Sequence, residues 1–190
     1  MHSETNHGCL TTERLVLRPF TQDDAPEVAR LCNNERLNRR VLLLPYPYEE
    51  TDARAWIGTH AERAAMGRAY TFAVTGRTVG TLYGCMGLEC DATNRRAEAG
   101  YWFGEPYWGR GYATEALGAL LAFAFTTLKL HRVTAKHFGS NPASGRVMEK
   151  NGMRLEGTLR EHILKNGVFE DAVCYGILKS EWLLQEKRAR

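Results

Sequence analysis

The chain has 190 residues, of which 44% are hydrophobic and 25% are charged, the composition of an ordinary globular protein. Its formal net charge is +3, from 25 basic and 22 acidic residues. The longest near-continuous apolar run, Ala116 to Phe125, is interrupted by Gly118 and is far shorter than the roughly 20 residues that span a bilayer. No basic segment followed by an apolar stretch opens the chain, so we expect neither a signal peptide nor a membrane partner.

The distribution of basic residues and cysteines argues against nucleic-acid and metal sites. The basic residues are scattered, whereas a duplex-binding protein concentrates them on one face. The five cysteines form no Cys-x-x-Cys pair, and the six histidines form no His-x-x-x-His pair. We therefore expect free thiols, a reducing cytoplasmic location, no metal site and no nucleic-acid partner.

The first half of the chain predicts a strand, two helices and a pair of strands. In chain order we expect a strand ending at Pro19, a helix starting near Thr21, a loop over residues 33–47 with room for one helical turn, a helix over residues 53–64, and strands over residues 70–74 and 79–88. Apolar residues follow helical spacing in the second helix, where His60 is interpreted as a packed residue rather than a catalyst. After Gly67 the apolar residues alternate with a period of two, which is typical of strands.

The second half predicts more strands and two further helices. We expect a strand over residues 97–103, a long buried helix over 112–128, a strand over 133–137, a helix that starts at Asn141-Pro142 and stops before Gly152, and two strands flanking Asn166-Gly167. Asn-Gly is typical of a tight hairpin turn. The order β-α-α-β-β-β-α-β-α-β-β predicts a single α+β domain with a mixed, mostly antiparallel sheet of about seven strands flanked by helices.

The segment Trp108–Ala116 is the most informative for function. It follows a strand, contains Gly109 and Gly111, and opens a helix. Unpaired amides at a helix N-terminus, approached closely through glycines, can bind a pyrophosphate. Taken alone, the same glycines are better explained by a tight turn that needs positive φ angles. The segment has neither the third glycine of a dinucleotide fingerprint nor the Lys-Ser/Thr of a Walker loop.

Trp108–Ala116 resembles the acyl-CoA pyrophosphate loop of the GNAT N-acetyltransferase superfamily, in particular its RimJ/RimL-like branch of ribosomal-protein N-terminal acetyltransferases. Three other segments resemble that branch in the same order, namely residues 12–19, 141–153 and 175–182. The general superfamily loop begins with Gln or Arg, where this chain has Trp108; that departure is common in the branch and concerns one side-chain contact. We expect a GNAT-like domain over residues 12–182, after a flexible segment 1–11 and before a tail 183–190.

The resemblance implies that two strands splay apart and hold acetyl-CoA, with no metal, for direct transfer of the acetyl group to a primary amine in a ternary complex. Pantetheine would lie along the strand end at residues 101–103, and the pyrophosphate on the amides of residues 110–114. The implied cofactor-binding residues are Tyr101, Trp102, Phe103, Trp108, Gly109, Arg110, Gly111, Tyr112, Ala113, Thr114 and Asn141. Asn141 also fits a simple helix N-cap, and Arg146 and Lys150 fit solvated helix charges as well as phosphate contacts.

Acetyl transfer needs a base, because an α-amine with a pKa near ~7.7–8.0 is largely protonated at neutral pH. Glu98 is the candidate, since strand alternation places it with Gly100 and Trp102 on the face with the least bulk. A solvated strand carboxylate is the alternative interpretation. Glu105 and Glu115 are weaker candidates, because dipole stabilisation in a first helical turn already explains Glu115.

Ser144 is the candidate acid that assists the departing thiolate. It is the third residue after Asn141 and occupies the position where the RimJ/RimL-like branch often has Ser, while many GNAT enzymes use a Tyr for this role. The alternative is a helix-start serine hydrogen-bonded to local backbone.

The acceptor is the least specified part. The resemblance assigns the acceptor pocket to the 33–47 loop and the Asn166-Gly167 hairpin, and it suggests a monomer or homodimer. We expect an enzyme that acetylates the N-terminal α-amine of a protein or peptide. Two alternatives are acetylation of a small amine (an aminoglycoside, polyamine or amino acid) and a non-catalytic acyl-CoA-binding regulator. The cluster of Arg36, Arg39 and Arg40 disfavours polycations.

Overall fold

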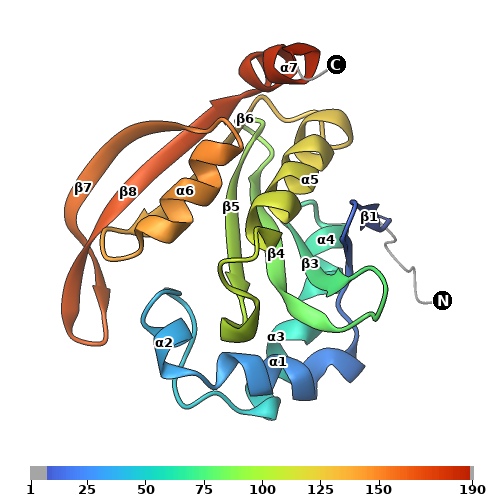
Figure 1. Ribbon diagram of the computed structural model, residues 1–190, viewed down its shortest axis with the longest axis vertical. Coiled ribbons are helices and arrows are strands. Elements are labelled where there is room, and N and C mark those ends of the chain that lie inside the picture. Colours follow the sequence, from blue (N-terminus) through green and yellow to red (C-terminus); the bar gives the residue numbers. More distant parts are fainter. Residues whose placement is uncertain (1–7, 189–190) are drawn as a thin grey trace.

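The computed structural model describes residues 8–188, which build a mixed sheet with helices on both faces (Figure 1). The 8 strands have the order β1-β2-β3-β4-β5-β6-β8-β7. All neighbouring strands are antiparallel except β5 and β6, which are parallel. The strands are β1 (Leu10–Thr11), β2 (Leu15–Pro19), β3 (Ala69–Gly76), β4 (Leu82–Asp91), β5 (Arg96–Phe103), β6 (Arg132–Phe138), β7 (Arg154–Lys165) and β8 (Val168–Leu178).

The helices cover the sheet unevenly. They are α1 (Ala25–Cys32), α2 (Glu35–Asn38), α3 (Glu50–Gly58), α4 (His60–Ala65), α5 (Tyr112–Thr126), α6 (Pro142–Lys150) and α7 (Lys179–Arg188), with short 3-10 helices η1 (Gln22–Asp24) and η2 (Glu105–Tyr107). In Figure 1, α5 and α6 lie in front of the sheet, and α1, α2 and α3 gather near the end where β5 stops. Within residues 8–188, none of the helices combines the length and apolar character that crossing a bilayer requires.

Two apolar cores explain why the central strands alternate as they do. Ala97, Ala99 and Phe103 of β5 pack with the apolar residues of α5, which is buried on most of its surface. Trp102, between them, points to the other face and packs with residues of α1 and α3. Because consecutive strand residues point to opposite faces, Glu98 and Gly100 share the face of Trp102. This arrangement confirms the alternation that the sequence predicted for this strand.

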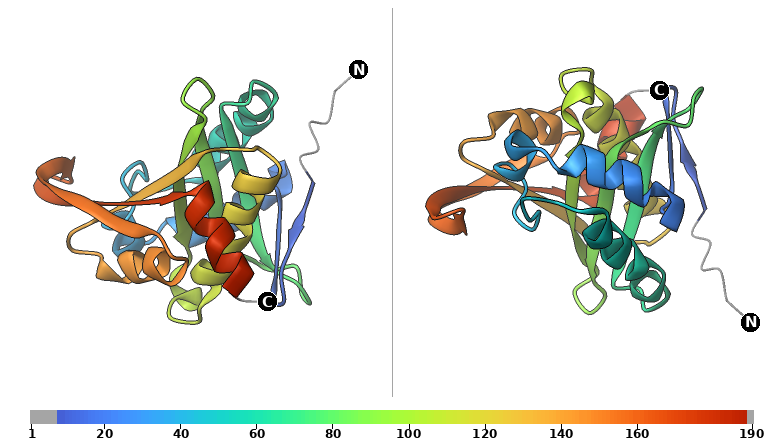
Figure 2. Two further views of the ribbon diagram at one scale, coloured as in Figure 1. Left: turned by 90° about the horizontal axis from the view of Figure 1, so that it is seen from above. Right: turned by 90° about the horizontal axis from the view of Figure 1, so that it is seen from below.

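The sheet opens between its two parallel strands. Pairing of β5 with β6 runs from Arg96↔Arg132 to Ala99↔Ala135 and stops there, although β5 continues to Phe103 and β6 to Phe138. On the other side, β5 remains paired with β4 along its whole length. A gap therefore separates the second halves of β5 and β6. The β7–β8 hairpin curls away from the rest of the sheet, and its tip lies beside α2 (Figures 1 and 2).

The predicted fold class is confirmed, with local differences. The sheet has 8 strands rather than about seven, because Leu10–Thr11 pair with β2. The predicted loop 33–47 does contain one helical turn, α2, which is capped by the Asn34 side chain accepting from the Leu37 N–H at 3.0 Å. The predicted helix over residues 53–64 is divided into α3 and α4.

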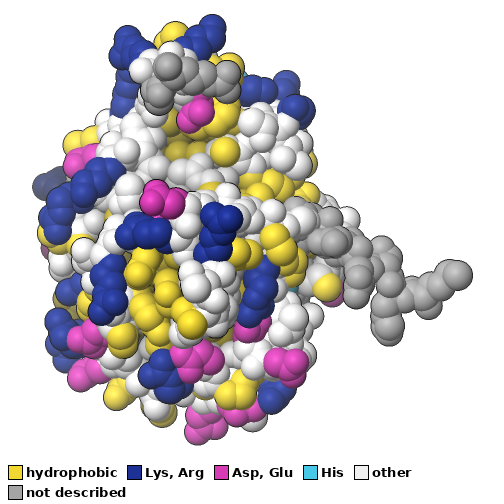
Figure 3. All heavy atoms as spheres, turned by 45° about the vertical axis from the view of Figure 1, so that its right-hand side comes forward, with side chains coloured by type: hydrophobic (Ala, Val, Ile, Leu, Met, Phe, Trp, Pro, Cys, Tyr) yellow, Lys and Arg dark blue, Asp and Glu magenta, His cyan; other side chains and the backbone are white. Residues whose placement is uncertain are grey.

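Both predicted terminal segments contain regular structure where they are described. Leu10 and Thr11 form β1, and residues 183–188 belong to α7, so regular structure continues beyond residues 12–182 on both sides. Residues 1–7 of the predicted N-terminal segment and residues 189–190 of the predicted tail lie outside the described part. On the face shown in Figure 3, basic and acidic side chains are interspersed around exposed apolar ones.

Candidate active site

A cavity of about 720 Å³ follows the gap between β5 and β6 and reaches both faces of the sheet. On the α5–α6 face, its walls are the turn before α5, the first turns of α5 and α6, and Tyr101. On the opposite face, its walls are Glu98, Lys136, Ile163 and the segment that follows α2. One cavity thus contains both predicted catalytic residues, Glu98 and Ser144, which approach it from opposite faces of the sheet.

The turn between η2 and α5 has the conformation of an anion-binding loop. Gly109 and Gly111 have φ angles of +72° and +80°, the left-handed region that costs other residues roughly 1–2 kcal/mol. A Cβ atom on Gly109 would meet nothing within 4 Å, so the outer side of the turn is open. The first amides of α5, which begins at Tyr112, have no acceptor within the helix and lie at the positive end of its dipole. Amides in this arrangement bind phosphate groups.

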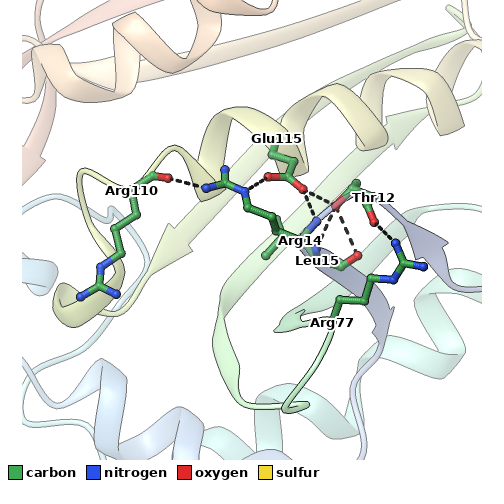
Figure 4. A network of polar contacts seen from close by, with 6 residues as sticks. All are labelled: Thr12, Arg14, Leu15, Arg77, Arg110 and Glu115. Atoms are coloured by element: carbon green, nitrogen blue, oxygen red, sulfur yellow. Dashed lines mark hydrogen bonds and ion pairs between the residues drawn. The ribbon is translucent and has the colours of Figure 1, made fainter.

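A polar network holds that turn against the N-terminal strands (Figure 4). The Glu115 carboxylate accepts hydrogen bonds from Thr12 Oγ1 at 2.6 Å, from the Arg14 backbone N–H at 2.8 Å and from Arg14 Nε at 2.6 Å. Arg14 Nη1 also donates to the Arg110 carbonyl oxygen at 3.1 Å. Burial on its own raises the pKa of Glu115, but the hydrogen bonds from Thr12 and Arg14 outweigh it, and the net pKa is lowered. Glu115 therefore positions the turn.

The free edge of β5 offers backbone groups to the gap. Gly104 N–H donates to Tyr83 O of β4 at 2.9 Å, and hydrogen-bonding directions alternate along an antiparallel strand. The amides of Tyr101 and Phe103 therefore point away from β4, towards the gap. The backbone of Trp102 is instead turned to β4 and its side chain to the α1–α3 core, although the residue still lines the cavity. Its predicted contact with the cofactor stays a prediction.

Trp108 contacts the same end of β5 through its side chain, which the sequence did not predict. Its indole Nε1 donates to the Phe103 carbonyl oxygen at 2.6 Å. The guanidinium of Arg40 lies over its ring at 4.6 Å, and that of Arg36 lies at 5.7 Å. The tryptophan at this loop position therefore connects the end of β5 with the segment that follows α2.

Ser144 faces the gap in partnership with a tyrosine. Its Oγ lies 2.7 Å from the Tyr101 hydroxyl, which also donates to the Ser144 carbonyl oxygen at 3.1 Å. Burial raises the pKa of Tyr101 to about 12, although the hydrogen bond with Ser144 acts in the opposite direction. The Asn141 side chain makes no cap hydrogen bond with α6 and lines the cavity, so the simple N-cap interpretation does not describe it.

Glu98 is one of two carboxylates that face each other across β4 and β5. Its Oε1 lies 3.0 Å from Lys136 Nζ on β6, and its side chain is 47% exposed. Glu89 of β4 is directly opposite in the register and pairs with Arg63 at 2.6 Å. Like charges directly opposite each other destabilise a strand pair, and here each carboxylate has its own cation. Glu89 also lines the cavity, and the sequence analysis did not find it.

The Glu98 face of the cavity, where we expect the acceptor, is bordered by contacts between segments far apart in the chain. Lys165 Nζ, at the tip of the β7–β8 hairpin, donates to the carbonyl oxygens of Leu42 at 3.1 Å and Leu44 at 2.9 Å. Asn166 donates to Asn38 Oδ1 at 2.8 Å, and Asn38 in turn donates to Leu44 O at 2.6 Å. The 33–47 loop and the hairpin, both assigned to the acceptor pocket by resemblance, are thus in direct contact.

Two other residues that the sequence analysis considered, Glu105 and His60, do not line this cavity. Glu105, the reserve candidate for the base, accepts a hydrogen bond from Asn34 at 2.8 Å and pairs with Arg36. His60 packs between Phe20 and Trp56, and burial lowers its pKa to about 4, helped by the charge of Arg63. Across residues 8–188, no three His, Cys, Asp or Glu side chains are placed to hold a metal ion.

A family model described as an acetyltransferase (GNAT) domain matches residues 14–154. The chain belongs to the GNAT acetyltransferase family. YoaA of Bacillus subtilis, an uncharacterized N-acetyltransferase, is 32% identical over 90% of this chain and 96% of its own. The ribosomal protein uS5-alanine N-acetyltransferase of Escherichia coli is 25% identical over 91% of this chain and 92% of its own. A GNAT-family acetyltransferase structure from Bacillus anthracis is 28% identical, covers 92% of this chain and 100% of its own, and has a TM-score of 0.82.

The protein is therefore an acetyl-CoA-dependent GNAT N-acetyltransferase, as its motifs predicted. The residues on the α5–α6 face fit that co-substrate: the open turn at Gly109 and Gly111 offers amides to phosphates, and the free edge of β5 offers alternate amides to an extended chain. The contributions of the individual predicted residues to binding and catalysis stay predictions.

Proposed function

We propose that this GNAT enzyme transfers the acetyl group directly to the N-terminal α-amine of a protein or peptide, with both substrates bound at once. The observation that carries this proposal is the cavity through the β5–β6 gap, which joins the two faces of the sheet. Acetyl-CoA supplies an acetyl group activated as a thioester. An amine that enters from the Glu98 face reaches the gap without crossing the turn at residues 109–114. Acetyl-CoA and the amine can therefore be bound at the same time.

Glu98 acts as the base in this proposal. A protonated α-amine has no lone pair for attack, so it must first lose a proton to a base. The neutral amine then attacks the thioester carbonyl carbon, and the proton left on the nitrogen becomes more acidic as the new bond forms. The ion pair with Lys136 orients the Glu98 carboxylate at the point where β5 and β6 separate. From there Glu98 takes the proton of the amine, either directly or through one water molecule.

The Ser144–Tyr101 pair holds a proton on the opposite side of the gap. The two hydroxyl oxygens are 2.7 Å apart, and either can be the donor. When Tyr101 donates to Ser144 Oγ, the Ser144 proton is free to turn towards the cavity. The high pKa of Tyr101, caused by burial, keeps its hydroxyl protonated at neutral pH. Through Ser144, the pair donates a hydrogen bond to a thiolate as it departs, which is the acid role predicted for this serine.

A polypeptide acceptor is supported by the entrance to the cavity. Leu42 and Leu43 line it with exposed fractions of 39% and 88%, an apolar surface suited to the side chains and backbone of a peptide. A relative named as an alanine N-acetyltransferase of a ribosomal protein further supports a protein N-terminus as acceptor.

A thiol-release assay with acetyl-CoA tests this function. One arm uses N-terminally free peptides, a second uses the same peptides with a blocked N-terminus and an internal lysine, and a third uses polyamines, aminoglycosides and amino acids. We expect release only in the first arm, with mass spectrometry placing the acetyl group on the α-amine. Steady release with small amines and none with free peptides would contradict the proposal, and release with no acceptor at all would point to simple hydrolysis.

A further inference from the structure

The charges that line the acceptor side of the cavity do not balance. The cations on this side are Arg40, Arg63 and Lys136, and the carboxylates are Glu89 and Glu98. Arg63 pairs with Glu89 at 2.6 Å and Lys136 with Glu98 at 3.0 Å. In the part of the chain that the structure describes, Arg40 has no carboxylate within ion-pair distance. One uncompensated positive charge therefore faces the acceptor.

The position of Arg40 is fixed although its charge is unpaired. Its guanidinium lies 4.6 Å from the centre of the Trp108 ring, well within the range of a cation–π contact. Trp108 is itself anchored by its hydrogen bond to the Phe103 carbonyl oxygen. When a guanidinium contacts an aromatic ring with its flat face, the N–H groups at its edge remain free. Two of these N–H groups can donate parallel hydrogen bonds to one carboxylate.

The two neighbouring arginines show that the unpaired charge is particular to Arg40. Arg36 pairs with Glu105, and Arg39 pairs with Glu35 at 2.5 Å on the surface of α2. Neither Arg36 nor Arg39 lines the cavity. Of the three arginines in this cluster, Arg40 alone combines a place in the cavity with a free charge.

We infer that Arg40 selects acceptor peptides that carry an acidic side chain near their N-terminus, which deepens and rests on the proposed function. The amine must reach the gap beside Tyr101, whereas Arg40 lies over Trp108, beyond the end of β5 at Phe103. The strand advances by roughly 7 Å between Tyr101 and Phe103, about two residues of an extended peptide. Arg40 is therefore placed to bind the carboxylate of an Asp or Glu at the second to fourth position of the peptide. The carboxylate of a free amino acid lies too close to its own amine to reach Arg40.

The test compares amidated tetrapeptides that differ only in charge, Ser-Ala-Glu-Ala and Ser-Ala-Gln-Ala. We expect the KM of the acidic peptide to be about three- to tenfold lower, the range of a partly exposed charged contact, with a similar kcat. Calorimetric binding of both peptides to the CoA-saturated enzyme should show the same ratio. Arg40→Gln should abolish the preference, Arg40→Glu should transfer it to Ser-Ala-Lys-Ala, and Arg39→Gln, the matched control, should retain it.

Equal KM values for the two peptides with the wild-type enzyme would overturn the inference and leave peptide acetylation intact. A preference that survives Arg40→Gln, or that Arg39→Gln reduces equally, would overturn it as well, by showing that the general field of the surface is responsible. If no peptide is acetylated while free amino acids are, the proposed function fails and this inference fails with it. If an Arg40 variant folds poorly, equal wild-type KM values still overturn the inference, and a preference that Arg39→Gln retains but a second, folded Arg40 variant loses supports it.

Discussion

The two sides of the cavity are built in different ways. On the cofactor side, the proposed phosphate site is made of backbone from a short continuous segment, residues 109–114, whose shape depends on two left-handed glycines and on the hydrogen bonds of Glu115. The acceptor side is made of side chains from separate segments, and the contact of Lys165 with Leu44 joins residues 121 positions apart. A backbone site binds whatever fits its amides, whereas a side-chain site changes its specificity with single substitutions. We therefore propose that the binding of acetyl-CoA and the choice of acceptor are encoded separately.

The largest effect is expected where the two sides meet, at Glu98. Glu98→Gln preserves size and hydrogen bonding but cannot accept a proton, so turnover at neutral pH should fall by about 10²- to 10⁴-fold. Acetyl-CoA affinity should remain unchanged, and raising the pH should restore part of the rate by deprotonating the free amine. Initial rates from pH 6 to pH 10 measure both effects.

The matched control for Glu98 is Glu89→Gln. Glu89 lies directly opposite Glu98, lines the same cavity and also pairs with a cation, but its partner Arg63 comes from α4 rather than from β6 at the gap. Turnover within a few-fold of wild type is expected for Glu89→Gln. If the two variants exchanged these results, the base would be Glu89; a wild-type rate in Glu98→Gln would remove Glu98 from the mechanism.

On the cofactor side, Gly111→Val should weaken acetyl-CoA binding by about 10- to 100-fold, because a β-branched residue at a φ of +80° is strained by roughly 1–3 kcal/mol. Its Cβ would also lie 3.4 Å from Arg14 Nη2. The measurement is the rise in melting temperature with acetyl-CoA, which for wild type grows with RT ln(1 + [L]/Kd).

Gly80→Val is the control, since Gly80 has a φ of +68°, open surroundings and a place in the β3–β4 turn away from the cavity. It should lower the melting temperature of the free protein yet keep the full acetyl-CoA shift. A Gly111→Val enzyme with the wild-type shift would show that the turn at residues 109–114 does not bind the pyrophosphate.

The hydroxyl pair at the gap should have a smaller influence. Ser144→Ala removes one hydrogen bond to a thiolate that is already a fair leaving group, so kcat should fall about 3- to 10-fold, in line with the net worth of a single hydrogen bond. Tyr101→Phe should have a similar effect, and the double variant should lose less than the product of the two, because the hydroxyls share one contact. Tyr175→Phe, which removes a hydroxyl bound to Glu149 outside the cavity, is the control. Multiplicative losses in the double variant would show that the two hydroxyls act independently.

The same contrast explains what the sequence could predict. Glycines before an apolar helix and the order of strands are local features. The sequence could therefore predict the GNAT family, the α+β sheet and the placement of Glu98 and Ser144 in one cavity. The Ser144–Tyr101 and Glu89–Glu98 pairs depend on sheet register and on the packing of α6, which no local pattern specifies. The contacts of Lys165 with two carbonyl oxygens leave no signal in the sequence, because any lysine near a hairpin turn looks the same.

The network beneath the turn provides a weaker test of the cofactor side. Glu115→Gln keeps the hydrogen bond to Thr12 but loses the charge paired with Arg14, so acetyl-CoA affinity should fall about 3- to 5-fold. Because the folded-state pKa of Glu115 is lowered, its carboxylate stabilises the fold above its ordinary pKa, and this contribution is lost as the pH falls through the lower folded value. Urea unfolding of wild type and Glu115→Gln should therefore differ at pH 7 and converge at strongly acidic pH. A constant difference would assign the effect to packing.

The smallest effect is expected at the acceptor side, from Lys165→Met. Burial lowers the pKa of Lys165, and its ammonium group holds the carbonyl oxygens of Leu42 and Leu44. Methionine keeps the apolar stem but has no donor, so the segment after α2 should open more often while the turn before α5 is untouched. The KM for an acceptor peptide should then rise about two- to threefold, the modest net value of such a contact, with kcat and acetyl-CoA affinity unchanged.

Hydrogen exchange should become faster for the amides of residues 41–47 and stay constant for those of 109–114. Lys187→Met, on α7 and away from the cavity, should change neither. If exchange in 41–47 is the same in Lys165→Met and wild type, the hairpin does not hold the entrance; if 109–114 also exchanges faster, the two sides are mechanically coupled and their separation is wrong.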